Sequence, residues 1–193
     1  NTLNMDKAIE QVFKAFNHLA REIQVYLFSG VVIAVNALII DYFYYNSTLL
    51  AFIQTHNLTI PVAIVLYLIG QFCMAFFYTI LEWTKVDKKI NKILKFAYSV
   101  DSKSLPKLYR INPELYLHFV ERYIILTMMR WTLSAACFIN LIIDIIVIFN
   151  KDFHWQFLLT TIVFGTGTIT FYLLTTRTEN DYADRINSLK DDQ

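Results

Sequence analysis

The chain has 193 residues, of which 56% are hydrophobic, 16% are aromatic and only 17% are charged. Lys and Arg number 17 and Asp and Glu number 16, so the formal net charge is +1. This composition excludes an ordinary soluble domain, because a soluble helical bundle of this size would need polar faces that the long apolar stretches do not have.

The first pattern along the chain is typical of an amphipathic helix. Between Met5 and Ile23, apolar residues recur at helical spacing, and charged or polar residues lie between them. We expect this helix either to lie on the inner membrane surface or to pack against other cytoplasmic helices.

Four apolar stretches follow, each close to the roughly 20 residues that a helix needs to cross a bilayer. They are residues 26–45, 60–83, 131–149 and 155–174. Aromatic residues that favour the headgroup region stand at several of their ends, namely Tyr42, Tyr44, Tyr45, Trp83, Trp131 and Trp155. The sequence therefore predicts an all-α polytopic membrane protein, with four transmembrane helices in two tandem hairpins and amphipathic cytoplasmic helices.

A basic segment follows the second apolar stretch. The helix is expected to continue through residues 84–100, with apolar residues on one face. The other face is basic and contains Lys85, Lys88, Lys89, Lys92 and Lys95. This face either is solvated and sets the topology, or contacts anionic lipid or an acidic soluble partner; direct contact with nucleic acid is not expected. Pro106 and Pro113 break the helix, and a new helix is expected from Pro113 to Phe149.

The positions of the basic residues predict the topology. Three of the 17 precede the first span, nine lie between the second and third, and three follow the fourth. Arg130 stands at the inner end of the third span, and only Lys151 falls on the other side. The positive-inside rule then places both termini and the central segment in the cytoplasm. We therefore predict a multi-pass protein of the inner (plasma) membrane.

A short polar motif occurs twice in the chain. Residues 38–41 and 141–144 both read LIID, and Asn36 and Asn140 stand shortly before them. A helical segment leads into each odd-numbered span, and a charged segment leaves each even-numbered one. We therefore predict two repeat units, residues 1–100 and 101–193, related by a pseudo-twofold axis along the membrane normal.

Polar residues inside the spans are candidate functional positions. They are Asn36, Asp41, Gln71, Asn140 and Asp144. Placing Asp at the centre of a membrane helix costs about 2.5–3.5 kcal/mol, so ionisable residues there are functional hypotheses by default. We expect the two Asn side chains to fix packing by hydrogen bonds across helices. The two Asp side chains either do the same or act in ion or proton passage, or in sensing at the outer face.

The fourth span contains Gly165 and Gly167 among several threonines. Small residues let helices approach closely, and threonines can bond across the gap or to their own helix. This pattern favours a self-association interface, and hence a homo-oligomer. A pore-lining helix is the alternative interpretation.

The sequence contains none of the common catalytic or metal-binding motifs. The chain contains no metalloprotease, nucleophile-elbow, phosphate-binding or paired-cysteine motif. The histidines are predicted on both sides of the membrane and so cannot form one metal site: His18, His56, His118 and His154. Cys73 and Cys137 fall inside spans, where we expect buried thiols. The sequence predicts a non-enzymatic protein without a cofactor or metal.

In length, span count and charge layout, the chain resembles the small membrane subunit of bacterial antiphage systems of the Kiwa type. The resemblance implies a four-span protein that works with a soluble partner in antiphage defence. With the basic helices, it leads to the hypothesis of an oligomeric inner-membrane protein that senses envelope disturbance and relays it to a soluble cytoplasmic partner. The alternatives are an ion-conducting, pore-forming effector and a membrane immunity or exclusion protein.

Overall fold

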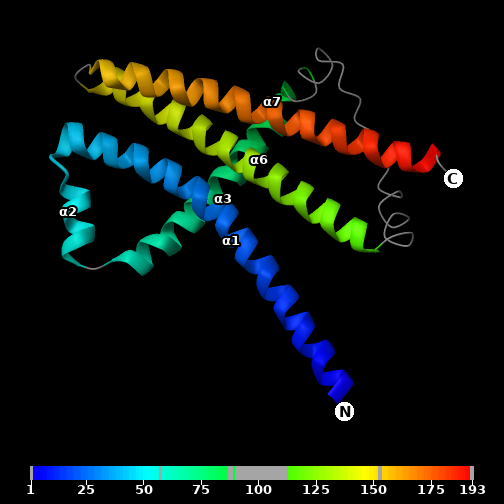
Figure 1. Cartoon of the computed structure of the whole chain (residues 1–193). Helices are drawn as coiled ribbons and strands as arrows, with labels where there is room; N and C mark the ends of the chain where they lie inside the picture. Colours follow the sequence, from blue (N-terminus) through cyan, green and yellow to red (C-terminus); the bar gives the residue numbers. More distant parts are fainter. Residues whose placement is uncertain (1, 57, 87–88, 90–112, 152–153, 192–193) are drawn as a thin grey trace. The chain divides into compact units, whose positions relative to one another are not determined.

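A computed structural model describes residues 2–56, 58–86, 89, 113–151 and 154–191 (Figure 1). Within these residues the regular structure is entirely α-helical, which confirms the predicted all-α class. The helices are α1 (Thr2–Tyr45), α2 (Thr48–Thr55), α3 (Thr59–Thr84), α6 (Pro113–Asn150) and α7 (Trp155–Asp191).

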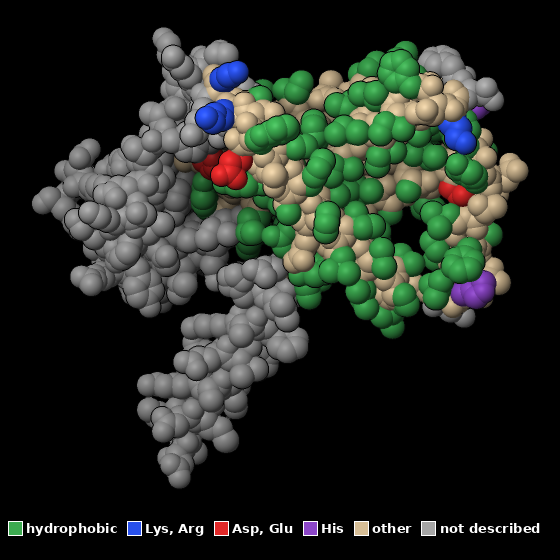
Figure 2. Space-filling view, turned by 180° about the vertical axis from the view of Figure 1, so that it is seen from behind, with side chains coloured by type: hydrophobic (Ala, Val, Ile, Leu, Met, Phe, Trp, Pro, Cys, Tyr) green, Lys and Arg blue, Asp and Glu red, His purple; other side chains and the backbone are tan. Residues whose placement is uncertain are grey.

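Four of these helices are long and apolar enough to cross a bilayer, as predicted. Their candidate spans are Ile23–Tyr45, Ile60–Thr84, Ile125–Asn150 and Trp155–Glu179. An α-helix satisfies its own backbone hydrogen bonds, so such segments can lie in lipid without leaving polar groups unpaired. Many of their large apolar side chains are exposed within the chain, and Figure 2 shows hydrophobic side chains covering much of the described surface. This surface suits contact with lipid in a multi-pass membrane protein.

Three helices continue without a break beyond their spans. Residues 2–22 of α1, 113–124 of α6 and 180–191 of α7 belong to the same helices as the spans themselves. The predicted helix from Pro113 is thus confirmed. A helix that lies flat on the membrane surface must turn where its span begins, whereas α1 is continuous across that point (Figure 1). The continuity of α1 therefore favours an N-terminal segment that projects from the membrane.

The second span ends within one residue of its predicted end, and its helix is interrupted directly afterwards. α3 stops at Thr84, and Lys85 has a left-handed backbone with a φ of 52°. A left-handed residue directly after a helix is a common stop, because it turns the chain away from the helix axis. The helix predicted to continue through residues 84–100 is therefore interrupted at Lys85. Val86 and Lys89 are helical again, and the amide of Lys89 donates to the carbonyl oxygen of Lys85 at 3.3 Å. Lys88, Lys92 and Lys95 lie outside the described residues.

The connection between the first two spans was not predicted to be helical. It contains α2, a helix of eight residues. Asn46 and Ser47 have left-handed backbones, with φ values of 53° and 60°, and these residues turn the chain from α1 into α2. Asparagine and serine tolerate this conformation better than bulky residues. The apolar side chains of Leu49, Leu50 and Phe52 on α2 are exposed.

The chain forms two compact units, residues 1–71 and 72–193, and the boundary falls inside α3. In the first unit, α1 and α3 cross at two glycines. A Cβ added to Gly30 would meet the backbone of Leu66, with the carbonyl carbon at 2.6 Å. One added to Gly70 would meet the backbone of Tyr26 and, at 2.6 Å, the Oγ of Ser29. Only glycine leaves room for backbones this close.

The second unit contains the hairpin of α6 and α7, joined by residues 151–154, together with the second half of α3. Its hydrophobic core consists of Phe77, Ala135 and Tyr172, with Leu81, Trp131 and Phe138 packed against it. The ring of Phe77 lies 5.4 Å from that of Phe138 and 6.0 Å from that of Trp131, measured between centroids. The two compact units have other boundaries than the predicted repeat units 1–100 and 101–193, and the repeat stays a prediction.

Candidate functional site

A row of buried polar side chains lies along α6. Ser134, Asn140 and Asp144 have no exposed surface within the chain, and Thr132 is almost as deeply buried. Asn140 and Asp144 are four residues apart and therefore lie on the same face of the helix. A polar side chain in a lipid-facing position costs free energy, so turning this face inward is the stable arrangement. The two candidate residues of the third span are thus brought together in the interior of the chain.

The close contact between α6 and α7 lies in the middle of this row. The hydroxyl of Ser134 donates a hydrogen bond to the carbonyl oxygen of Thr168 at 3.0 Å. A Cβ added to Gly167 would lie 3.0 Å from the Sγ of Cys137. Gly167, expected at an interface between copies, therefore packs against α6 of its own chain. Gly165 has more room, because its added Cβ would meet nothing nearer than a methyl group of Leu141 at 3.8 Å.

Hydrogen bonds also join α6 to α7 near the start of the span in α6 and the end of the span in α7. The guanidinium of Arg130 donates to the carbonyl oxygen of Leu174 at 3.3 Å and to the hydroxyl of Thr178. The indole N–H of Trp131 donates to the carboxylate of Glu179 at 3.1 Å. A charge-assisted bond of this kind is stronger than a neutral one. These contacts fix the register of the hairpin, and no sequence pattern predicted them.

Asp41 has a role that its position in the sequence did not reveal. Its carboxylate, 6% exposed, accepts hydrogen bonds from the hydroxyl of Thr48 at 3.1 Å and the amide N–H of Leu49 at 2.9 Å. A third, longer bond of 3.4 Å comes from the amide of Leu50. Within the described residues, Ser47 at the N-cap position adds no side-chain bond. The carboxylate of Asp41 therefore caps α2, where a negative charge also suits the positive end of the helix dipole.

The other predicted residues are placed as follows. Asn36 is fully buried on α1, and its predicted packing role stays a prediction. Gln71 is exposed, and its amide donates to the hydroxyl of Tyr67, one turn earlier on α3, at 2.8 Å. Lys85 and Lys89 are exposed at the end of α3 and just beyond it. Gln71 thus bonds within its own helix.

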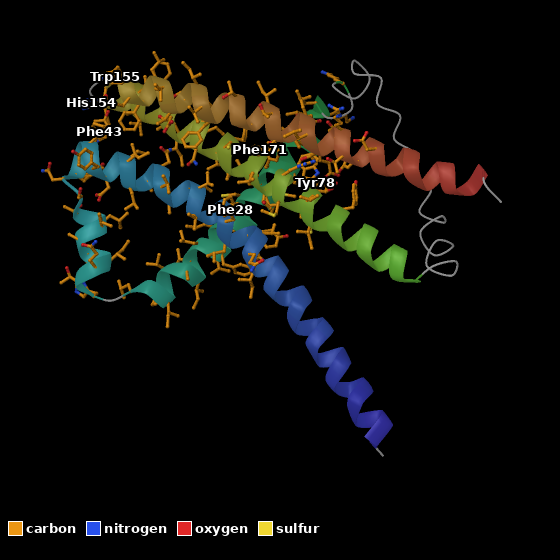
Figure 3. All side chains as sticks on the ribbon, viewed as in Figure 1. Phe28, Phe43, Tyr78, His154, Trp155 and Phe171 are labelled. Carbon is orange, nitrogen blue, oxygen red and sulfur yellow. The ribbon has the colours of Figure 1, made fainter. Side chains whose placement is uncertain are left out.

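The ends of the spans carry exposed aromatic side chains. Trp155 begins α7 and is 63% exposed, and Figure 3 shows it beside the turn that joins α6 to α7. Figure 3 also shows Phe43 in the last turns of α1, where the neighbouring Tyr42 and Tyr45 are exposed. Trp and Tyr rings at these positions suit the headgroup region, because one edge is apolar and the other can form hydrogen bonds with water.

The polar side chains described above can form hydrogen bonds between helices. Among the residues that the structure describes, no three His, Cys, Asp or Glu side chains gather into a possible metal site. Cys73 and Cys137 are both buried and both free thiols. Comparison with protein-family models, with curated proteins and with solved structures found no match. The geometry defines a four-span α-helical membrane protein, and its function has to be argued from that geometry.

Proposed function

We propose that this protein is a non-enzymatic relay of the inner membrane, which senses envelope disturbance and holds or releases a soluble cytoplasmic partner. The observation that carries the proposal is the continuation of α1, α6 and α7 beyond their spans. At 1.5 Å per residue, residues 2–22 extend about 30 Å, and residues 113–124 and 180–191 extend about 18 Å each. Rigid helices of this length can present a binding surface outside the bilayer.

All three extensions emerge on one side of the membrane. Successive spans cross in alternating directions, so the start of α1, the start of α6 and the end of α7 share a side. Among the residues that the structure describes, the opposite side carries the connection through α2 and the short connection between α6 and α7. The positive-inside rule assigns the extensions to the cytoplasm, with both termini. A partner of this protein is therefore expected there.

The charge of the central segment indicates the chemistry of that partner. Residues 85–112 contain eight basic and two acidic residues. A basic surface attracts an acidic protein and speeds its association. The layout that resembles a Kiwa-type membrane subunit supports the same interpretation, and with it a role in antiphage defence as a homo-oligomer.

The burial of the polar residues favours a relay over an ion-conducting pore. Asn140 and Asp144 are enclosed within the chain, and the carboxylate of Asp41 is engaged with α2. A residue that lines a water path needs an exposed polar surface, which these side chains do not offer. Their burial is instead what a rigid support for the projecting helices requires. The immunity hypothesis stays a prediction.

The test is purification of the tagged protein from its native host in mild detergent, followed by mass spectrometry of what accompanies it. We expect a soluble protein at stoichiometric amount. It should be lost when Lys88, Lys89 and Lys92 are replaced by Glu. A second variant replaces Lys7, Lys14 and Arg21 by Glu. It makes the same change of charge on the extension of α1 and shows whether the companion contacts that helix as well.

Both variants need a topology check, because basic residues orient the protein. Protease accessibility of a C-terminal tag in spheroplasts supplies that check. Recovery of the protein without any soluble companion would overturn the proposal. Full retention of the companion by the variant at Lys88, Lys89 and Lys92, in unchanged topology, would overturn the assignment of the contact to the basic segment.

A further inference from the structure

The short helix α2 has an apolar face that neither α1 nor α3 covers. None of its eight residues, all of which the structure describes, is buried. Leu49, Leu50 and Phe52 are 43%, 41% and 54% exposed. At 100° per residue, these three and Ile53 fall on one side of the helix, which we call the α2 apolar face. The opposite side consists of Thr48, Ala51, Gln54 and Thr55.

The position of α2 places this face at a membrane surface. α2 connects the end of the span in α1 to the start of the span in α3, and both of those points lie at the same surface of the bilayer. α1 and α3 cross at Gly30 and Gly70 and separate towards α2, which bridges their ends (Figure 1). A helix that joins two points at the same depth runs along the surface and not away from it.

The charge pattern points to lipid as the neighbour of this face. Residues 42–81 contain no Lys, Arg, Asp or Glu, so the whole connection through α2 is without formal charge. The connection between α6 and α7, in contrast, contains Lys151 and Asp152. A short amphipathic helix with an exposed apolar side, flanked by aromatic residues at a span end, suits the boundary between headgroups and acyl chains.

We propose that α2 is an interfacial helix whose apolar face inserts into the adjoining leaflet, and that the carboxylate of Asp41 holds it there. Under the proposed topology this is the outer leaflet. The bonds from Thr48, Leu49 and Leu50 to Asp41 join the start of α2 to the last turn of α1. The bilayer itself is thus the partner of this surface. The proposal does not depend on the relay function.

Spin labels on the two sides of α2 test the insertion. The protein, with Cys73 and Cys137 replaced by Ala, carries a single nitroxide at Phe52→Cys or at Gln54→Cys, in vesicles of phosphatidylethanolamine and phosphatidylglycerol. Power saturation compares oxygen, which concentrates in lipid, with a nickel chelate, which stays in water. We expect the label at position 52 to favour oxygen and the label at position 54 to favour nickel. Equal behaviour of the two labels, in either direction, overturns the proposal.

Two variants at Asp41 test the role of its carboxylate. In Asp41→Ala the capping acceptor is gone, so the label at position 52 should become more mobile and lose part of its preference for oxygen. Asp41→Asn keeps an acceptor oxygen and should restore most of the wild-type spectrum. Circular dichroism and size-exclusion chromatography show whether each variant is folded. An Asp41→Ala protein with an unchanged spectrum would overturn the proposed role of the carboxylate.

Discussion

Replacing Gly30 with alanine should weaken the packing of α1 on α3. The added Cβ would overlap the backbone of Leu66, whose Cα would lie only 3.0 Å away. A backbone cannot rotate out of the way as a side chain can, so the two helices must separate. Gly30→Ala is therefore expected to destabilise the first compact unit, although alanine is the better helix former.

The expected change in the free energy of unfolding of Gly30→Ala is the sum of two effects of opposite sign. Alanine in place of a helical glycine gains about 1 kcal/mol. Overpacking of a close contact costs about 1–3 kcal/mol, and a contact with backbone belongs at the upper end of that range. The net loss is then about 1–2 kcal/mol, and each 1.4 kcal/mol is about a tenfold change in the folding equilibrium.

Unfolding of the protein by SDS in mixed micelles, followed by circular dichroism, measures this loss. Gly165→Ala is the matched control, because its new Cβ would meet only a methyl group at ordinary contact distance, 3.8 Å. It should leave the midpoint unchanged or raise it. Equal midpoints for Gly30→Ala and Gly165→Ala would refute the close crossing of α1 and α3.

The same unfolding assay tests three contacts between α6 and α7. Gly167→Ala should lower the free energy of unfolding by about 1 kcal/mol, because its Cβ meets the Sγ of Cys137. Adding Cys137→Ala to the same chain should remove most of that loss, and losses of the two single variants that simply add in the double variant would contradict the contact. Ser134→Ala should cost about 0.6 kcal/mol through its bond across the hairpin, whereas Thr166→Val, which loses only bonds within α7, should have little effect. Trp131→Phe keeps an aromatic ring but loses the N–H bond to α7, for an expected loss of about 1 kcal/mol, and an unchanged midpoint would argue against that bond.

The close contacts of the glycines show where sequence reasoning stops. Gly30 and Gly70 were not singled out as packing residues, because a glycine in an apolar stretch does not reveal which backbone lies opposite. Ser29, next to Gly30, was the available signal, since neighbouring small residues often mark a helix crossing. Gly167 was recognised as a packing residue, but its partner could only be found once α6 and α7 were placed side by side.

Asp41 illustrates the same limit for a polar residue. Its place inside the first apolar stretch could be seen in the sequence, and the structure buries its side chain. Its partners come seven to nine residues later in the chain, after a turn made by left-handed Asn46 and Ser47. Because no helix was predicted between the first two spans, the N-terminus of α2 was not available as an explanation for the carboxylate.

The sequence by itself determined the helical class, the four spans and the long helix from Pro113, because each depends on apolar length and local breakers along one segment. The tertiary structure alone decided which faces meet: the crossing at Gly30, the cap that Asp41 provides, and the bonds of Arg130 to α7. These contacts join segments that are distant in sequence or separated by a sharp turn. They depend on the geometry of two helices at once, which no pattern within a single helix can specify.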